Sequence, residues 1–101
     1  MNGIAHIYFW KSEQHEEVDF IVRQELKTRQ LIQVCYDLRN IKTKDREIRA
    51  LLKASKELGC KDLLVLTEDY QGEEILNWFG IEEKVKFMPL HMWLLNSPHF
   101  I

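Results

Sequence analysis

Four polar residues at alternate positions of two nearby segments could bind a metal ion together. Glu17 and Asp19 lie in EVDFIVRQ, and Gln33 and Cys35 lie in RQLIQVCYDL. Alternation places each pair on one face of its strand, so a hairpin of suitable register would bring a carboxylate and an amide oxygen together. Oxygen ligands of this kind suit Mg²⁺, with water completing the octahedron. The alternative is structural: Asp19 faces solvent on a half-buried hairpin, and Gln33 pairs with it.

A second charged group lies on the segment 43–59, which we expect to be a helix. Its basic residues fall within about 80° of one another at the helical period, and they are Arg46, Arg49, Lys53 and Lys56. Such a ridge could contact the phosphates of a nucleic acid. The alternative is a solvated helix face, because Asp45, Glu47 and Glu57 dilute the positive charge.

Other catalytic motifs do not occur in the sequence. The 4 glycines are too far apart for a phosphate-binding loop or a dinucleotide fingerprint. The 4 histidines show no paired metal-ligand spacing. No nucleophile-elbow pattern supports a serine triad. Nucleotide chemistry is therefore not expected of this chain.

Composition predicts one soluble globular domain over residues 1–101. Hydrophobic residues make up 46% and charged residues 30%, and 14 basic against 16 acidic residues give a net charge of −2, so no net field attracts nucleic acid or an anionic membrane. No apolar run approaches the ~20 residues of a membrane span, and the amino terminus lacks a signal-peptide pattern. Two cysteines without Cys-x-x-Cys spacing predict reduced thiols and a cytoplasmic location.

The elements that must position these residues follow from periodicity. Three strands at 5–12, 17–24 and 29–38 predict an antiparallel meander, in which Val18, Phe20 and Val22 share one face. The helix at 43–59 follows, with Thr43 as its expected N-cap and Gly59 as its end.

The second half of the chain continues the alternation of strands and helices. The expected elements are a strand at 61–69 covered on both faces, a short helix at 72–79, an edge strand at 84–90 containing Pro89, and a helical turn in HMWLLNS before a loose PHFI tail. The predicted order is β-β-β-α-β-α-β-α, a mixed sheet with helices packed on it in the α/β class.

The segments EEVDFIV, LIQVCYDL and TKDREIRALLKASKELG together resemble a carboxy-terminal domain of archaeal and bacterial AAA-type ATPases of poorly defined function. That domain is similar to the restriction-endonuclease-like, PD-(D/E)xK nuclease fold. The resemblance covers roughly residues 8 to 95. It implies that Asp19 matches the metal-binding Asp on the second core strand, Gln33 the acidic ligand on the third, and Cys35 the lysine.

The departures from this motif imply a degenerate nuclease site. Gln33 keeps an oxygen but removes a negative charge, and Cys35 replaces the ammonium group that would orient water. Loss of such preorganised electrostatic stabilisation typically costs ~10² to 10³ in rate per group. The resemblance also implies a helix before the first strand, which we expect this chain to lack. Either the chain is a fragment or a short gene product, or a partner subunit covers the exposed sheet face. An uncovered apolar face favours self-association, so a homodimer is expected.

Three functions follow as expectations. The first is a catalytically degenerate, nuclease-like accessory or interaction domain that serves an ATPase domain or another protein partner, with no enzymatic activity and no cofactor. The second is a DNA nuclease dependent on Mg²⁺ or Mn²⁺, with Asp19 and Gln33 as ligands. The third is a non-catalytic nucleic-acid-binding module that uses the basic ridge.

Overall fold

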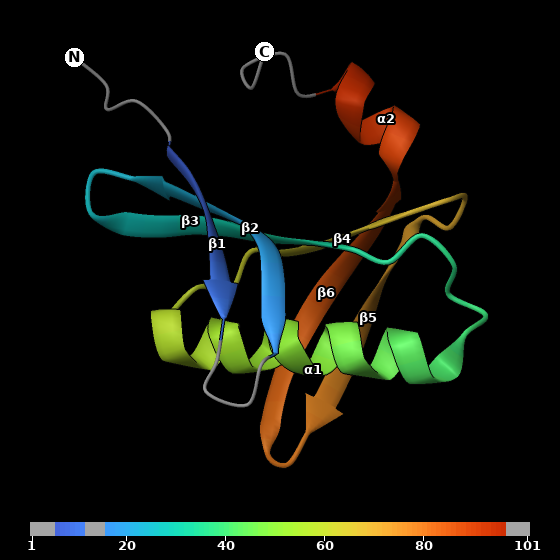
Figure 1. Ribbon diagram of the computed structural model, residues 1–101, viewed down its shortest axis with the longest axis horizontal. Coiled ribbons are helices and arrows are strands. Elements are labelled where there is room, and N and C mark those ends of the chain that lie inside the picture. The colour runs from blue at the N-terminus through green and yellow to red at the C-terminus, as the bar shows by residue number, and fades with distance from the viewer. Residues whose placement is uncertain (1–5, 12–15, 97–101) are drawn as a thin grey trace.

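One mixed sheet of six strands organises the chain. The computed structural model describes residues 6–11 and 16–96, and its strands lie in the order β1-β2-β3-β4-β6-β5 (Figure 1). The strands are β1 (His6–Lys11), β2 (Glu17–Gln24), β3 (Lys27–Val34), β4 (Leu63–Thr67), β5 (Gly72–Trp78) and β6 (Ile81–Pro89). The expected mixed α/β fold is confirmed.

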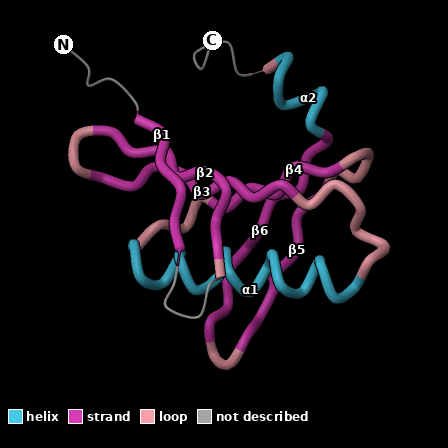
Figure 2. The backbone as a smooth tube through the Cα atoms, viewed as in Figure 1, coloured by secondary structure: helices cyan, strands magenta, loops and turns pink. Residues whose placement is uncertain are grey.

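Two helices lie on opposite sides of this sheet. The long helix α1 (Ile41–Leu58) packs on one face and α2 (Leu90–Leu95) on the other (Figure 2). The core on the α1 side is the larger; the core on the α2 side is formed by Val22, Ile32, Leu64 and Leu66. Among the described residues, no helix has the length and apolar composition needed to cross a membrane.

The first five elements follow the expected order. Strands β1, β2 and β3 form the predicted antiparallel meander, and α1 then carries the chain to β4, which pairs in parallel with β3. All five residues of β4 are buried, as its run of aliphatic residues predicted. Strand β4 also pairs in parallel with β6, so both of its edges are used.

A bulge in β2 separates Val18 from the face predicted for it with Phe20 and Val22. Tyr8 pairs with Ile21 and Trp10 with Val18, so two residues of β2 stand opposite one residue of β1. The extra residue breaks the strict alternation of side chains. Val18 and Ile21 therefore share the core on the α1 side, whereas Val22 lies in the core on the α2 side. Phe20 pairs with Ile32 of that second core and is 41% exposed.

The helix expected at 72–79 is wrong, because this segment is strand β5. Half-buried and exposed residues alternate along it with the period of a strand. Phe79 and Gly80 then form a two-residue turn with positive φ angles of 46° and 84°, which returns the chain into β6. The described order is therefore β-β-β-α-β-β-β-α.

The edge position expected for 84–90 is also wrong. Strand β6 lies between β4 and β5 inside the sheet. Pro89 is tolerated there because it is the last residue of the strand and leads directly into α2. The PHFI tail lies outside the described residues.

Helix α1 begins two residues earlier than the sequence predicts. Asn40, not Thr43, is the N-cap, and its side-chain oxygen accepts a hydrogen bond of 3.1 Å from the backbone N–H of Thr43. Gly59 ends the helix in the left-handed conformation, as expected, and its N–H bonds the carbonyl of Ser55.

The tip of the β2–β3 hairpin predicts a stabilising substitution. Leu26 is 93% exposed and has a φ of 69°, a left-handed conformation that costs an L-residue about 1–2 kcal/mol. Leu26→Gly removes this strain and no buried surface, although glycine is more flexible in the unfolded chain. We expect a net gain of roughly 0.5–1 kcal/mol in the free energy of unfolding, measured by urea denaturation.

Leu26→Ala is the matched control, because alanine removes the same exposed side chain but keeps the strained backbone. It should leave the stability near that of the original chain. Equal gains from glycine and alanine would show that backbone strain at the turn is not the cause.

Candidate functional site

The buried side chain of Gln33 joins β2, β3 and α1 where the two strands diverge. Regular pairing of β2 with β3 ends at Phe20 and Ile32. Beyond that point the Gln33 Oε1 atom accepts the Asp19 N–H at 2.8 Å, and its Nε2 donates to the Glu17 carbonyl at 2.8 Å. The second Nε2 hydrogen reaches the Glu47 carbonyl of α1 at 3.1 Å.

Asp19 makes the reciprocal contact from β2 to β3. Its Oδ2 atom accepts a hydrogen bond of 2.8 Å from the backbone N–H of Val34. The side chain of Gln33 therefore bonds the backbone of β2, and the side chain of Asp19 bonds the backbone of β3. We call this pair the Asp19–Gln33 clamp. It replaces the ladder hydrogen bonds that the diverging strands cannot make.

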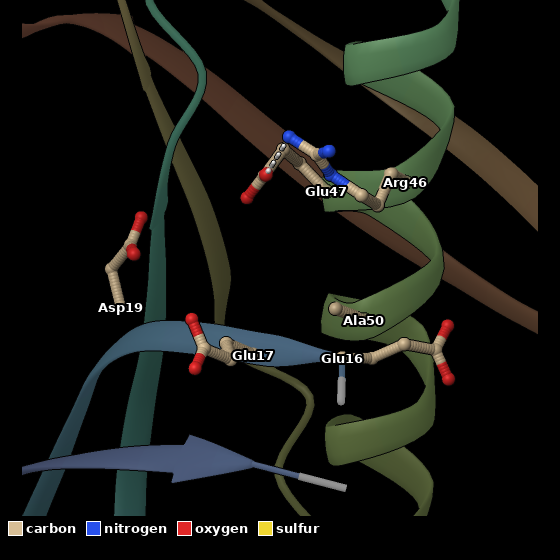
Figure 3. Close-up of a pocket in the computed structure, with 6 residues that line it drawn as sticks. All are labelled: Glu16, Glu17, Asp19, Arg46, Glu47 and Ala50. Carbon is tan, nitrogen blue, oxygen red and sulfur yellow. Dashed lines mark hydrogen bonds and ion pairs between the residues drawn. The ribbon is translucent and has the colours of Figure 1, made fainter. Parts of the chain in front are cut away.

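An acidic pocket opens beside the clamp, between β2 and α1. Its volume is about 250 Å³, and it is lined by Glu16, Glu17, Asp19, Arg46, Glu47 and Ala50. Figure 3 shows the carboxylates of Glu17, Asp19 and Glu47 around one space, with the Arg46 guanidinium against Glu47. The Glu16 carboxylate points away from these three (Figure 3). The structure thus brings Asp19 together with a helix residue that the sequence did not single out as a site residue.

Burial and the crowding of negative charge raise the pKa of Glu47 in this pocket. Burial raises the pKa of Glu47, and the charges of Asp19 and Glu17 raise it further, while Arg46 opposes both. Like charges that share a pocket disfavour the ionised state of the most buried member. Glu47 is therefore the carboxylate that a cation or a proton in this pocket would relieve most.

The described residues nevertheless form no ready metal centre. Within 6–11 and 16–96, no group of three or more histidine, cysteine, aspartate or glutamate side chains is arranged to hold a metal ion. The oxygen of Gln33 that could have served as a ligand already accepts the Asp19 N–H. A metal here would need the carboxylates of Asp19, Glu17 and Glu47 to move together.

Cys35 lies just beyond β3, inside the core on the α1 side. It is buried, and its N–H donates to the Leu66 carbonyl at 2.9 Å. Burial raises the pKa of its thiol, with a further contribution from Glu47. Cys35 is thus a protonated core side chain at neutral pH, and it is not among the residues that line the acidic pocket.

The basic ridge of α1 is largely occupied by ion pairs. Glu16, a buried carboxylate, accepts a 2.6 Å bond from the Arg49 Nε and a bond from the Lys53 ammonium. Burial acts to raise the pKa of Glu16, but these two cations outweigh it and hold the pKa below its ordinary value. Arg46 pairs with Glu47 at 3.4 Å, and Lys56 is exposed in the last turn. Much of the positive charge available to phosphates is therefore offset.

No protein-family model matches the chain, and neither the curated proteins nor the solved structures contain a match to it.

The acidic pocket predicts a stability change that depends on pH. The pKa of Glu47 is higher in the folded than in the unfolded chain. The free energy of unfolding therefore falls as pH rises from 4.5, the unfolded value, to the folded pKa. Glu47→Gln should stabilise the fold at about pH 7, and the gain should disappear well below pH 4.5. Thermal unfolding of both proteins at the two pH values measures the difference.

Glu16→Gln serves as the opposite control, because the pKa of Glu16 is lowered in the folded chain. Its ionised form contributes stability above the unfolded pKa of 4.5, and this contribution is lost as pH falls through the folded pKa. We expect a loss of about 1.5–3 kcal/mol at neutral pH and little change in acid. If both variants changed the stability at neutral pH in the same direction, the opposite pKa shifts assigned to Glu47 and Glu16 would be wrong.

The Asp19–Gln33 clamp predicts that replacement of Gln33 lowers the stability of the fold more than replacement of an exposed polar residue. Gln33→Leu keeps a similar volume but removes the side-chain bonds to the Asp19 N–H and the Glu17 carbonyl, and the additional bond to the Glu47 carbonyl within α1. Unsatisfied buried groups cost about 1–3 kcal/mol each, and partial access of water reduces the sum. We expect a loss of roughly 2–4 kcal/mol by urea denaturation.

Gln30→Leu is the matched control on the same strand. The Gln30 amide makes one exposed bond, 3.2 Å long, to the Asp62 carboxylate. Its loss should cost less than about 0.5 kcal/mol. If both leucine variants were equally stable, the clamp would not carry the energy assigned to it.

Proposed function

We propose that this chain is a restriction-endonuclease-like domain whose site no longer hydrolyses phosphodiesters. It acts as an accessory or interaction domain, related to the carboxy-terminal domain of AAA-type ATPases, with an ATPase domain or another protein as its partner. Its two cysteines are free and buried, which suits the reducing cytoplasm predicted for it.

The arrangement of β1, β2, β3, α1 and β4 supports the fold part of the proposal. A β-β-β meander, a crossover helix and a strand parallel to β3 follow one another in the expected order. Asp19 on β2 and Gln33 on β3 are the positions that match the nuclease motif, and they lie side by side. Their adjacency is what a motif divided between the second and third strands requires.

The use of Gln33 as a structural residue is the observation that carries the functional part. Both polar atoms of its amide are bonded to backbone groups of β2 and α1. An acidic side chain in this position would direct a carboxylate oxygen at the Glu17 and Glu47 carbonyls, which accept hydrogen bonds and cannot donate them. These hydrogen bonds therefore favour glutamine at position 33. Glutamine lacks the negative charge that phosphodiester hydrolysis would use there.

Cys35 supports the same conclusion. The motif needs a cation that faces the metal site, whereas this side chain is a buried thiol in the apolar core. A lysine there would bury an ammonium group in the apolar core that contains Leu31 and Leu51, or displace these side chains, at a cost of several kcal/mol. The position has become part of the core.

A metal-dependent nuclease is the second candidate, and the acidic pocket favours it. Asp19, Glu17 and Glu47 surround one space, and the raised pKa of Glu47 means that a divalent cation would relieve repulsion there. Mg²⁺ or Mn²⁺ would be the metal. Asp19 would then act with two carboxylates that the nuclease motif does not include, in place of Gln33.

Cleavage of supercoiled and branched DNA with Mg²⁺ or Mn²⁺ tests the two candidates. We expect no metal-dependent product above that of the buffer, because the site lacks both the acidic ligand and the cation of the motif. The variants Asp19→Asn and Glu47→Gln should give the same result. Asparagine is chosen because its amide oxygen can still accept the Val34 N–H, so that the variant changes charge and keeps the clamp.

Cleavage that Asp19→Asn and Glu47→Gln abolish would refute the proposal and establish the metal-dependent enzyme. Cleavage that persists in both variants would come from a contaminating nuclease. Broadening by Mn²⁺ of the NMR signals of Glu17, Asp19 and Glu47 gives a second readout that does not depend on the substrate.

A further inference from the structure

Strand β5 forms an open edge of the sheet that carries two glutamates but no proline, lysine or bulge. Among the described residues its only strand neighbour is β6, and the two pair without a bulge over all seven residues of β5. The strand GEEILNW contains no proline and no lysine, the residues that commonly prevent an edge from pairing. Ile75, in its middle, is 70% exposed. A regular edge with an exposed isoleucine at its centre is a template for another strand.

The turn after β5 determines which backbone groups face outward. In a two-residue hairpin the residues that flank the turn, here Trp78 and Ile81, bond each other. Alternation then directs the N–H and C=O groups of Glu73, Ile75 and Asn77 away from β6. These three residues present six unpaired backbone groups along the edge.

We propose that two copies of this chain associate through β5, antiparallel to each other, about a twofold axis at Ile75. The inference names a partner for the interaction domain and so rests on the proposed function. Ile75 is the midpoint of Gly72–Trp78, so this register pairs the whole strand with itself. Each copy contributes the same surface, as a twofold interface requires.

The side chains on the exposed face complement one another in this register. Ile75 stands opposite the partner's Ile75 and buries its exposed side chain. Glu73 stands opposite the partner's Asn77, so a carboxylate meets an amide donor on each side of the axis. An axis at Glu73 or Glu74 would instead place two glutamates directly opposite each other, which is destabilising.

The face of β5 that points toward α1 gives a second apolar contact. Leu76 is half-buried beside α1, and in the proposed register it stands opposite the partner's Glu74. The two copies of Leu76 are then diagonal neighbours across the axis, close enough for contact. Glu74 keeps its ion pair with Lys44 of α1 at 4.0 Å. Apolar side chains therefore meet on both faces at the centre, and charges lie outside them.

Light scattering after size exclusion and sedimentation equilibrium measure the association. We expect a dimer of twice the 12.2 kDa chain, forming over roughly 1 to 300 µM, because an interface formed by one pair of strands is small and weak. Ile75→Lys should abolish it, since two ammonium groups would face each other at the axis. This position is exposed, so the variant should fold, and circular dichroism checks that it does.

Ile7→Lys is the matched control, because it makes the same exchange at a 52%-exposed position of the other edge strand, β1. It should dimerise like the original chain. A monomer at every concentration overturns the proposal. A dimer that survives Ile75→Lys, or one lost equally with Ile7→Lys, overturns it too.

Asn77 tests the register itself. Asn77→Lys places an ammonium opposite the partner's Glu73 at two symmetric sites and should tighten the dimer roughly 2- to 30-fold, whereas Asn77→Glu should weaken it by a similar factor. Equal effects of the two charges would contradict the antiparallel register at Ile75. Association by a protein that also cleaves DNA would refute only the proposed function, and an inactive monomer would refute only the dimer.

Discussion

The three hydrogen bonds of the buried Gln33 amide hold β2, β3 and α1 together. They join β2 to β3 at the point where backbone pairing stops, and they join both strands to α1. Asp19 completes the arrangement from the other side through the Val34 N–H. With its four polar contacts satisfied, the clamp lets β2 bend away from β3 and cover α1 without leaving buried backbone groups unpaired.

This use of polar residues bears directly on function. A metal site needs side-chain oxygens that are free to bind a cation, and a clamp needs the same oxygens bonded to the backbone. Both polar atoms of the Gln33 amide are bonded to the backbone, and the Cys35 side chain is buried in the apolar core. What remains open is the pocket of Glu17, Asp19 and Glu47 on one side and the edge of β5 on another. The proposed interaction function would use such surfaces to contact other molecules.

Much of the fold could be predicted from the sequence, and the misses have physical causes. The meander, α1 and the buried strand β4 follow from strong periodicity and from Gly59. Segment 72–79 was misjudged because Glu73, Glu74 and Leu76 also suit a helix, and only pairing with β6 decides for a strand. Alternation indicates the strand face of Asp19 and of Gln33, but their proximity also depends on the register of β2 with β3. The bonding of each side chain to the other strand's backbone was not predictable, because it depends on the bulge at Phe20.

Hydrogen exchange measured by NMR on the unmodified chain tests the clamp most directly. The account predicts that the Asp19 and Val34 amides, and the side-chain amide of Gln33, exchange as slowly as the amides of β4, since all of them open only when the fold does. It also predicts that saturating Mg²⁺ leaves the Gln33 signals in place. Fast exchange of the Gln33 side chain, or a shift of its signals on addition of Mg²⁺, would show that this amide is free to act as a ligand and would contradict the account.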